Sequence, residues 1–208
     1  MPTMSDPETN QDDTRQRMIA AAMQLFGQVG YSQATTRAIS EAAGVNEVTL
    51  FRHFGTKKNL LKACIDAFNA SSFAATFEAE LTNNYLEDIA IMARLQIQNT
   101  TANLEMLRLL LCDARNVPEL REAMLAGGRS NLARLSGYFQ RQIDLGIVHP
   151  DMPADVLAIA FDNLFSTNVL FENFFQDSLS PRLPTEEIIR PLVDLFVRGT
   201  QAPSPSVH

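Results

Sequence analysis

The side chains with the clearest chemical potential lie in one short stretch, AGVNEVTLFRHFGTKKNLL, in the first third of the chain. On a helix, Leu50 and Phe54 share one face, whereas Val48, Phe51 and Arg52 lie on the opposite side. Apolar groups on an outer face can contact thymine methyl groups, and an arginine can reach a guanine edge or a phosphate. The pattern is typical of a helix that reads DNA. A small amphipathic helix beneath a loop would give the same pattern, so periodicity leaves both interpretations open.

The charge distribution sets this stretch apart from the rest of the chain. The protein has 208 residues and a net charge of -7, which would ordinarily argue against a nucleic-acid partner. Residues 14–62, however, contain seven of the 17 Lys and Arg residues and only two of the 24 acidic residues. A small basic segment attached to an acidic body indicates an anionic partner for the basic part.

Composition excludes several other classes of protein. The hydrophobic fraction of 46% is too high for a disordered chain, and the longest apolar run, 156–161, is far shorter than a membrane span. No secretion signal opens the sequence, and Cys64 and Cys112 lack metal-type spacing, so we expect a cytoplasmic protein with two buried free thiols. Enzyme fingerprints such as a nucleophile elbow, a Walker loop or a His/Cys cluster are absent from the sequence. We therefore expect no catalytic activity, no cofactor and no metal site.

Nearly all of the chain has helical periodicity. Ile19, Ala22, Met23 and Phe26 form one stripe of a first helix, a second short helix follows Thr35, and Asn46 is a suitable N-cap for a third. Thr56 can cap a fourth. Further helices are expected at 83–99, 102–116, 119–145, 153–177 and 185–199. Alternation with period two is absent from the sequence, so we predict an all-α fold.

The ordered matches between Thr14 and Ala63 go beyond periodicity. They are Ala-Ala-x-x-Leu-Phe at the end of the first helix, Gly30-Tyr31, Thr35-Thr36, Ala43-Gly44-Val45, Thr49-Leu50-Phe51, His53-Phe54 and Lys57 before Leu60-Leu61. With these features the segment, about a quarter of the chain, closely resembles the DNA-binding module of the TetR/AcrR family of bacterial transcriptional regulators. The resemblance implies a helix-turn-helix in which the third helix enters the major groove of double-stranded DNA.

The resemblance also implies roles for individual side chains. Thr36, His53 and Lys57 are expected to contact phosphates, and Arg37 to reach a base or the backbone. The residues expected to face the major groove are Glu47, Val48, Thr49, Phe51 and Arg52. A place for His53 at the flank of the core is the alternative for that residue.

Two positions depart from the usual family pattern. The family usually has tyrosine where this chain has Phe51, so the phosphate-binding hydroxyl is missing and the ring is expected to contact a thymine methyl instead. Val48 stands where relatives often have glycine or proline, and its bulk should restrict which base fits.

The rest of the chain is expected to hold a dimer interface and an effector pocket, again by resemblance. In the family the last two long helices form a four-helix interface, which here would involve Leu157, Leu164, Val169, Phe171, Ile189, Leu192 and Phe196. The middle helices would surround a pocket for a small molecule, lined by Met92, Asn99, Met106, Leu110, Met124, Phe139, Phe161 and Phe165. Burial inside a single chain is the alternative for both sets.

Together these features predict four segments: a flexible leader at 1–13, a helix-turn-helix domain at 14–60, a helical effector-binding and dimerisation domain at 61–200, and a flexible tail at 201–208. We expect a homodimeric repressor that binds a palindromic operator and is released by a small apolar or amphipathic effector, with no membrane partner. Two alternatives remain: an effector-independent protein of the same fold that organises the chromosome, and an enzyme or carrier that has lost DNA binding.

Overall fold

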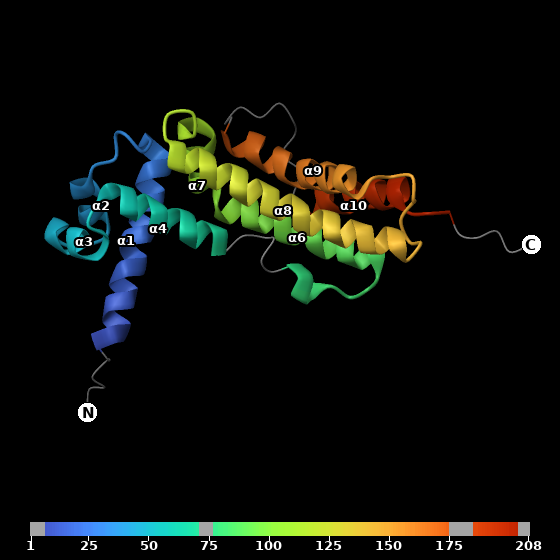
Figure 1. The fold of residues 1–208 in the computed structure, drawn as a ribbon, viewed down its shortest axis with the longest axis horizontal. Coiled ribbons are helices and arrows are strands. Elements are labelled where there is room, and N and C mark those ends of the chain that lie inside the picture. Colours follow the sequence, from blue (N-terminus) through green and yellow to red (C-terminus); the bar gives the residue numbers. More distant parts are fainter. Residues whose placement is uncertain (1–6, 71–76, 175–184, 204–208) are drawn as a thin grey trace, which may run out of the picture. The chain divides into compact units, whose positions relative to one another are not determined.

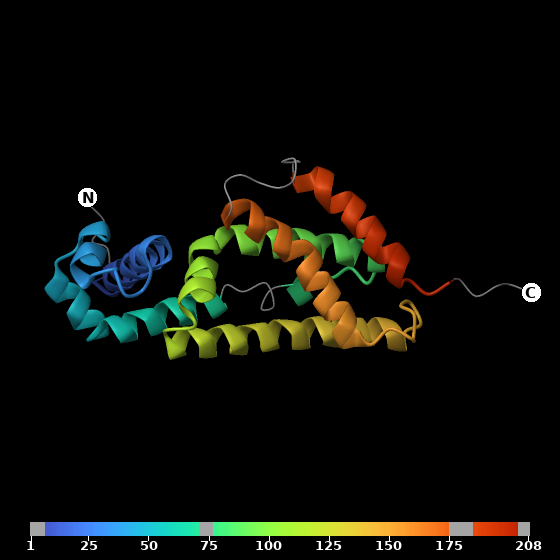
Figure 2. The same cartoon turned by 90° about the horizontal axis from the view of Figure 1, so that it is seen from above.

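The computed structural model describes residues 7–70, 77–174 and 185–203. Its elements, shown in Figures 1 and 2, are α1 (Pro7–Val29), α2 (Thr36–Ala42), α3 (Glu47–Phe54), α4 (Lys57–Ala70), the 3-10 turn η1 (Phe77–Glu80), α6 (Tyr85–Ala102), α7 (Leu104–Asp113), α8 (Pro118–Asp144), α9 (Ala154–Phe174) and α10 (Thr185–Thr200). Within the described residues, β-type pairing is limited to one isolated bridge between Val148 and Gln201. The predicted all-α fold is confirmed.

The helices form two compact units. The first, which we call the reader unit, contains α1 to α4, α7 and the first residues of α8, up to Met124. The second, the body unit, contains η1, α6, the remainder of α8, α9 and α10. The boundary predicted after residue 60 does not coincide with this division, because α4 continues to Ala70 and α7 packs against α1. A helix in the middle of the chain thus belongs spatially to the N-terminal unit.

The core of the reader unit is built on α1. Met18 and Phe26 from α1, Ile39 from α2 and Leu50 from α3 are completely buried, and Met106 from α7 is 1% exposed. Helices α2 and α3 lie beside α1 and α4 in both views (Figures 1 and 2). Burial of these apolar side chains is the main stabilising contribution to so small a unit.

The body unit has a separate aromatic core. Helix α6 packs against both α9 and α10, and four rings from three helices meet beside it. The ring centroid of Phe139 in α8 lies 6.1 Å from that of Phe161 in α9 and 5.7 Å from that of Phe196 in α10. The fourth ring is Tyr138, 5.3 Å from Phe139. Tilted and edge-on pairs of this kind add to the stability that burial alone provides.

Three details of the sequence-based picture need correction. Helix α1 begins at Pro7, so residues 7–13 of the expected leader are helical, while residues 1–6 lie outside the described part. Proline suits the first turn of a helix, and residues 7–13 escaped prediction because their polar sequence carries no apolar pattern. In the expected tail, the N–H of Ala202 donates to the carbonyl of Ile147, 2.9 Å away, so the chain is still paired there; residues 204–208 lie outside the described part.

The third correction concerns the thiols. Cys64 is fully buried, as expected, and burial raises the pKa of its thiol to about 12. Cys112 is exposed instead. Helix α7 turns Met106, Leu109 and Leu110 toward the core, which leaves Cys112 on the opposite side. The apolar stretch around this cysteine is wider than the face that α7 buries.

Helix α9 has the length and composition that a membrane-spanning helix requires, with a mean hydropathy of 1.3 over its most apolar window. Core helices of soluble proteins have these properties as well. Phe161 and Phe165 on α9 belong to the aromatic core of the body unit, whereas Val156 and Ile159 are exposed. The apolar character of α9 thus has two parts, one facing the core of its own chain and one facing outward.

Candidate nucleic-acid interface

Helix α3 is short and sharply bounded. Asn46 is its N-cap, and its side-chain Oδ1 accepts a hydrogen bond of 2.9 Å from the N–H of Val48. At the other end Gly55 has a φ of 72°, a conformation that glycine adopts without steric cost, and its N–H donates to the carbonyl of Phe51. Gly44, with a φ of 66°, makes the turn between α2 and α3. Local sequence therefore sets both ends of this eight-residue helix.

The two faces of α3 differ as the sequence predicts. Leu50 is completely buried and Phe54 is 7% exposed, and both point into the core of the reader unit. Val48 is 74% exposed and Phe51 is 44% exposed, and Arg52 is exposed beside them. The predicted inward and outward orientation of this helix is confirmed. Two large apolar side chains and a guanidinium thus form one outer surface.

A hydrogen bond joins the starts of α2 and α3. The hydroxyl of Thr36 donates to Oε1 of Glu47 across 2.6 Å, and both residues are half-buried. Thr36 follows Thr35, which caps α2 by accepting from the N–H of Ala38. This link joins the first turns of the two helices across the intervening turn. It also occupies the single proton of a hydroxyl that the family resemblance assigns to a phosphate.

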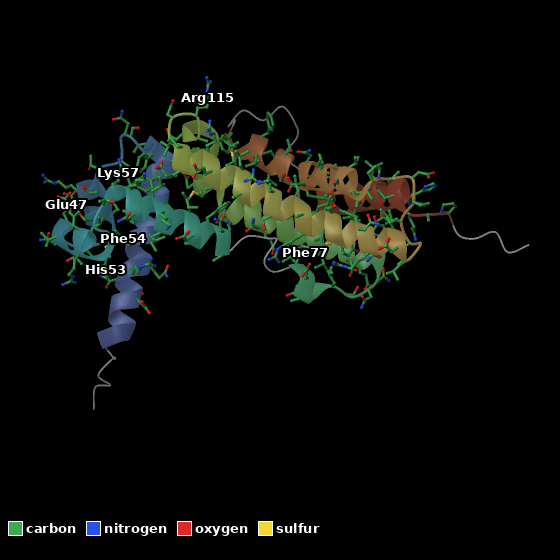
Figure 3. The ribbon with its side chains drawn as sticks, viewed as in Figure 1. Glu47, His53, Phe54, Lys57, Phe77 and Arg115 are labelled. Atoms are coloured by element: carbon green, nitrogen blue, oxygen red, sulfur yellow. The ribbon has the colours of Figure 1, made fainter. Side chains whose placement is uncertain are left out.

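Among the predicted contact residues, Lys57, labelled in Figure 3, has the most partners within its own unit. Its ammonium donates to the carbonyl of Tyr31 and lies 4.5 Å from the centroid of the Tyr31 ring and 5.9 Å from that of Phe26. Burial lowers the pKa of this amine below its usual value. An ammonium has three donors, so two remain when one is bound to the carbonyl. Lys57 therefore ties the start of α4 to the loop after α1, and phosphate contact would be additional to that role.

The remaining predicted contact residues differ in how firmly they are held. Arg37 is exposed and pairs with Glu41 one turn later, at 3.0 Å. Thr49 is half-buried, and so is His53, whose ring centroid lies 6.2 Å from that of Phe54. His53 thus lies at the rim of the core, between the two alternatives that the sequence left open, a phosphate contact on the surface and a place in the core.

Three supporting contacts were not predicted from sequence. Nη1 of Arg17 donates to the carbonyl of Ala43 at 3.3 Å, and the guanidinium of Arg15 lies 5.5 Å from the centroid of the Phe54 ring. The carboxylate of Asp113, on α7, accepts a 3.0 Å bond from the N–H of Tyr31. The paired residues lie 26 to 82 positions apart in the chain, so these contacts leave no local pattern from which the sequence could predict them.

Comparison with known proteins identifies the family of this chain. Residues 18–64 match the model described as "Bacterial regulatory proteins, tetR family". The transcriptional repressor AcnR of Corynebacterium glutamicum is 30% identical over 159 residues, which cover 73% of this chain and 76% of that protein. The chain belongs to the TetR family of bacterial regulatory proteins.

Two further matches show how far the similarity extends. The regulator YvkB of Bacillus subtilis is 37% identical over 75 residues, which are 35% of this chain and only 40% of that protein. The solved structure of FadR from Bacillus subtilis, in complex with stearoyl-CoA, aligns over 88% of this chain and 98% of its own with a TM-score of 0.71 at 16% identity. That structure shares the fold. This TetR-family chain is a DNA-binding transcriptional regulator, like its relatives, and not an enzyme.

The residues expected to line one effector pocket do not come together in one core. Met92, Phe139, Phe161 and Phe165 are buried in the core of the body unit, and Asn99 is half-buried on α6. Met106, Leu110 and Met124 belong to the core cluster of the reader unit, because α7 and the start of α8 pack there. In this TetR-family protein the predicted lining therefore divides between two cores.

The residues expected at the dimer interface divide as well. Leu157, Ile189 and Phe196 are buried within the single chain, and they are core residues rather than free surface. Leu164, Val169 and Leu192 are half-buried, and Phe171 is 54% exposed. Three further apolar residues of these helices face outward, although the sequence did not assign them to the interface: Val156, Ile159 and Leu195. Both helices are apolar on more than one side, so periodicity could not tell which stripe faces the chain's own core.

Proposed function

We propose that this protein is a homodimeric repressor in which each subunit places α3 in the major groove of a palindromic operator. The observation that carries the proposal is the outer face of α3, where Val48 and Phe51 stay exposed on a helix that is capped at both ends. Exposed apolar groups of this kind suit contact with thymine methyl groups, and Arg52 suits a guanine edge. We assign base reading to these three residues together with Glu47 and Thr49.

Phosphate contacts would position the reader without supplying sequence information. We assign them to Thr36, His53 and Lys57, with Arg37 at the backbone or a base edge. On binding DNA, the hydroxyl of Thr36 would have to turn from the carboxylate of Glu47 toward a phosphate. That exchange would free Glu47, whose carboxylate could then accept from a cytosine amino group.

Dimerisation follows from the reach of α3, because eight residues can read only a few base pairs. The outward apolar residues Val156, Ile159 and Phe171 on α9 and Leu195 on α10, between 48% and 65% exposed, support a second copy as the partner. Exposed apolar surface shared by two helices is typical of a protein interface. In a symmetric dimer the same patch on each subunit would meet its counterpart.

An effector would act by favouring the state that does not fit the operator. The body unit is the proposed binding region, with Met92, Asn99, Phe139, Phe161 and Phe165 as its candidate lining. FadR from Bacillus subtilis, which shares the fold, was solved with the amphipathic molecule stearoyl-CoA. The chain passes from α6 directly into α7, which packs against α1, so a shift of α6 has a short covalent path to the reader unit. Action in the cytoplasm, away from membranes, completes the proposal.

Selection of preferred DNA from a random pool with the purified protein tests this function. We expect an enriched palindrome with half-sites about one helical turn, or roughly 34–36 Å, apart. Arg52→Ala should abolish binding or relax the preference at one position per half-site. Arg129→Ala, which removes an exposed arginine from α8, is the matched control and should leave the selected sequence unchanged. Enrichment of no sequence, or the same result from both variants, would count against the proposal.

A further inference from the structure

Three polar side chains from three helices meet inside the body unit. Nε2 of Gln96 on α6 donates to Oδ1 of Asp162 on α9 at 3.1 Å, and Nδ2 of Asn131 on α8 donates to the same oxygen at 2.8 Å. Gln96 is 6% exposed, and the other two side chains are half-buried. We call these residues the amide–carboxylate cluster. One carboxylate oxygen thus receives both amide donors.

The carbonyl oxygens of the two amides are left over. Oε1 of Gln96 and Oδ1 of Asn131 are buried and have no hydrogen-bond partner among the described residues. Exchanging oxygen and nitrogen in either amide would turn an acceptor toward the carboxylate, so the contact with Asp162 fixes both orientations. A buried acceptor without a donor typically costs about 1–3 kcal/mol, and native proteins retain few of them.

The cluster is therefore rich in acceptors and poor in donors. In each amide the oxygen and nitrogen are bonded to one carbon and lie about 2.3 Å apart, so both leftover oxygens are within about 5.5 Å of Oδ1 of Asp162. Burial raises the pKa of Asp162, because the carboxylate has lost solvent that would stabilise its charge. A nearby cation would relieve the same penalty. Three acceptor groups and a desolvated negative charge favour a cationic ligand that donates hydrogen bonds.

We propose that the amide–carboxylate cluster binds the protonated primary amine of an amphipathic effector, an inference that rests on the regulatory function proposed above. A primary ammonium has three N–H donors, which match the two leftover carbonyl oxygens and the carboxylate. Phe161 and Phe165 flank the cluster on α9, with ring centroids 4.8 Å apart, and belong to the apolar core that would accommodate the rest of the molecule. An anionic head group would meet one negative charge and two carbonyl dipoles.

The position of the cluster gives the amine a role beyond affinity. Its three members come from α6, α8 and α9, and their polar side chains now meet at one shared oxygen of Asp162. One bound ammonium would add hydrogen bonds to all three helices. The leftover oxygens are closed to solvent, and the ligand must therefore separate the helices to reach them. Binding and helix movement are the same event at this site. That coupling is what an effector-released repressor requires.

Calorimetric titration with three matched probes tests the proposal: 3-phenylpropylamine, 3-phenylpropanol and 3-phenylpropanoate. The probes share one apolar body and differ only in the head group, which is cationic, neutral or anionic at pH 7. We expect the wild-type chain to bind the amine at least tenfold more tightly than the alcohol and the carboxylate. Asp162→Asn should reduce that ratio to about twofold or less. Asp155→Asn, which removes an exposed carboxylate from the same helix, should leave the ratio unchanged.

Several results would overturn the proposal. They are tighter binding of the carboxylate or the alcohol, a preference for the amine that survives in Asp162→Asn, and no binding of any probe up to millimolar concentration. Asp162→Asn should fold, because the side chain keeps its size and its oxygen can still accept from both amides. If it does not fold, the order of the three probes on the wild-type chain still decides. Loss of the amine preference in a protein that still selects an operator would refute this inference alone, whereas failure of operator selection would refute the proposed function.

Discussion

Substitutions on α3 test whether its outer face binds DNA while its inner face stabilises the fold. Val48→Ala removes two methyl groups from a side chain that is 74% exposed in the free protein. At about 0.8 kcal/mol for each buried carbon, complete burial of these groups contributes about 1.6 kcal/mol, of which about 1.2 kcal/mol is still available to a partner. We therefore expect about eightfold weaker binding per half-site, or about 60-fold for the dimer on the selected palindrome, with a change in unfolding free energy within about 0.5 kcal/mol.

Leu50→Ala is the matched control on the same helix. Leu50 is completely buried, so the same kind of truncation should lower the free energy of unfolding by about 2–5 kcal/mol. Urea unfolding followed by circular dichroism measures stability, and fluorescence anisotropy with labelled operator at fixed salt measures affinity. Unchanged affinity for Val48→Ala, or a loss of stability above about 1 kcal/mol, would refute the assignment of Val48 to the DNA surface.

Three further predictions concern other parts of the chain. Gly27→Ala would place a Cβ against the side-chain Oε2 of Glu105 on α7 and 2.6 Å from the backbone oxygen of the same residue, so it should lower the unfolding free energy by about 1–3 kcal/mol. Gly128→Ala, with open space around the new Cβ, should raise the unfolding free energy by about 0.5–1 kcal/mol. Equal effects of the two substitutions in urea titrations would contradict this packing. In the native protein a disulfide reagent should label Cys112 but not Cys64, whose pKa is raised to about 12, and both after denaturation; two rapid labels in the native state would disprove the burial. Burial raises the pKa of Asp162 above 3.8, so between 3.8 and the folded pKa the folded state holds a proton that the unfolded state has released. Stability should therefore fall as pH rises through this range, and Asp162→Asn should flatten that part of a pH series of thermal melts. An unchanged slope in the variant would contradict the burial of this carboxylate.

Local sequence was sufficient for the elements that depend on local interactions. Asn46 and Gly55 mark the two ends of α3, and the spacing of Leu50 and Phe54 identifies its buried face, because caps and periodicity act over only a few residues. Residues 7–13 escaped prediction for the complementary reason. They are polar in sequence, so the apolar periodicity on which the prediction relies is missing.

The features that could not be predicted from the sequence depend on which helices pack against one another in three dimensions. Met106 and Leu110 have the composition of a pocket lining, but α7 turns them into the core of the reader unit. The expected role of Lys57 is incomplete in the same way, since its contact with Tyr31 joins positions 26 apart. The amide–carboxylate cluster was invisible too, because Gln96, Asn131 and Asp162 gain meaning only when three helices bring them together.

The packing of α7 against α1 has a practical consequence for anyone who wishes to combine regulators. A chimera that joins this DNA reader to a foreign body after α4 would leave α7 behind. The face of α1 around Gly27 would lose its cover, and the N–H of Tyr31 would lose the carboxylate of Asp113. The transferable part is discontinuous: residues up to Ala70 together with Asn103–Met124. A functional hybrid therefore needs seams at three positions in the chain instead of one.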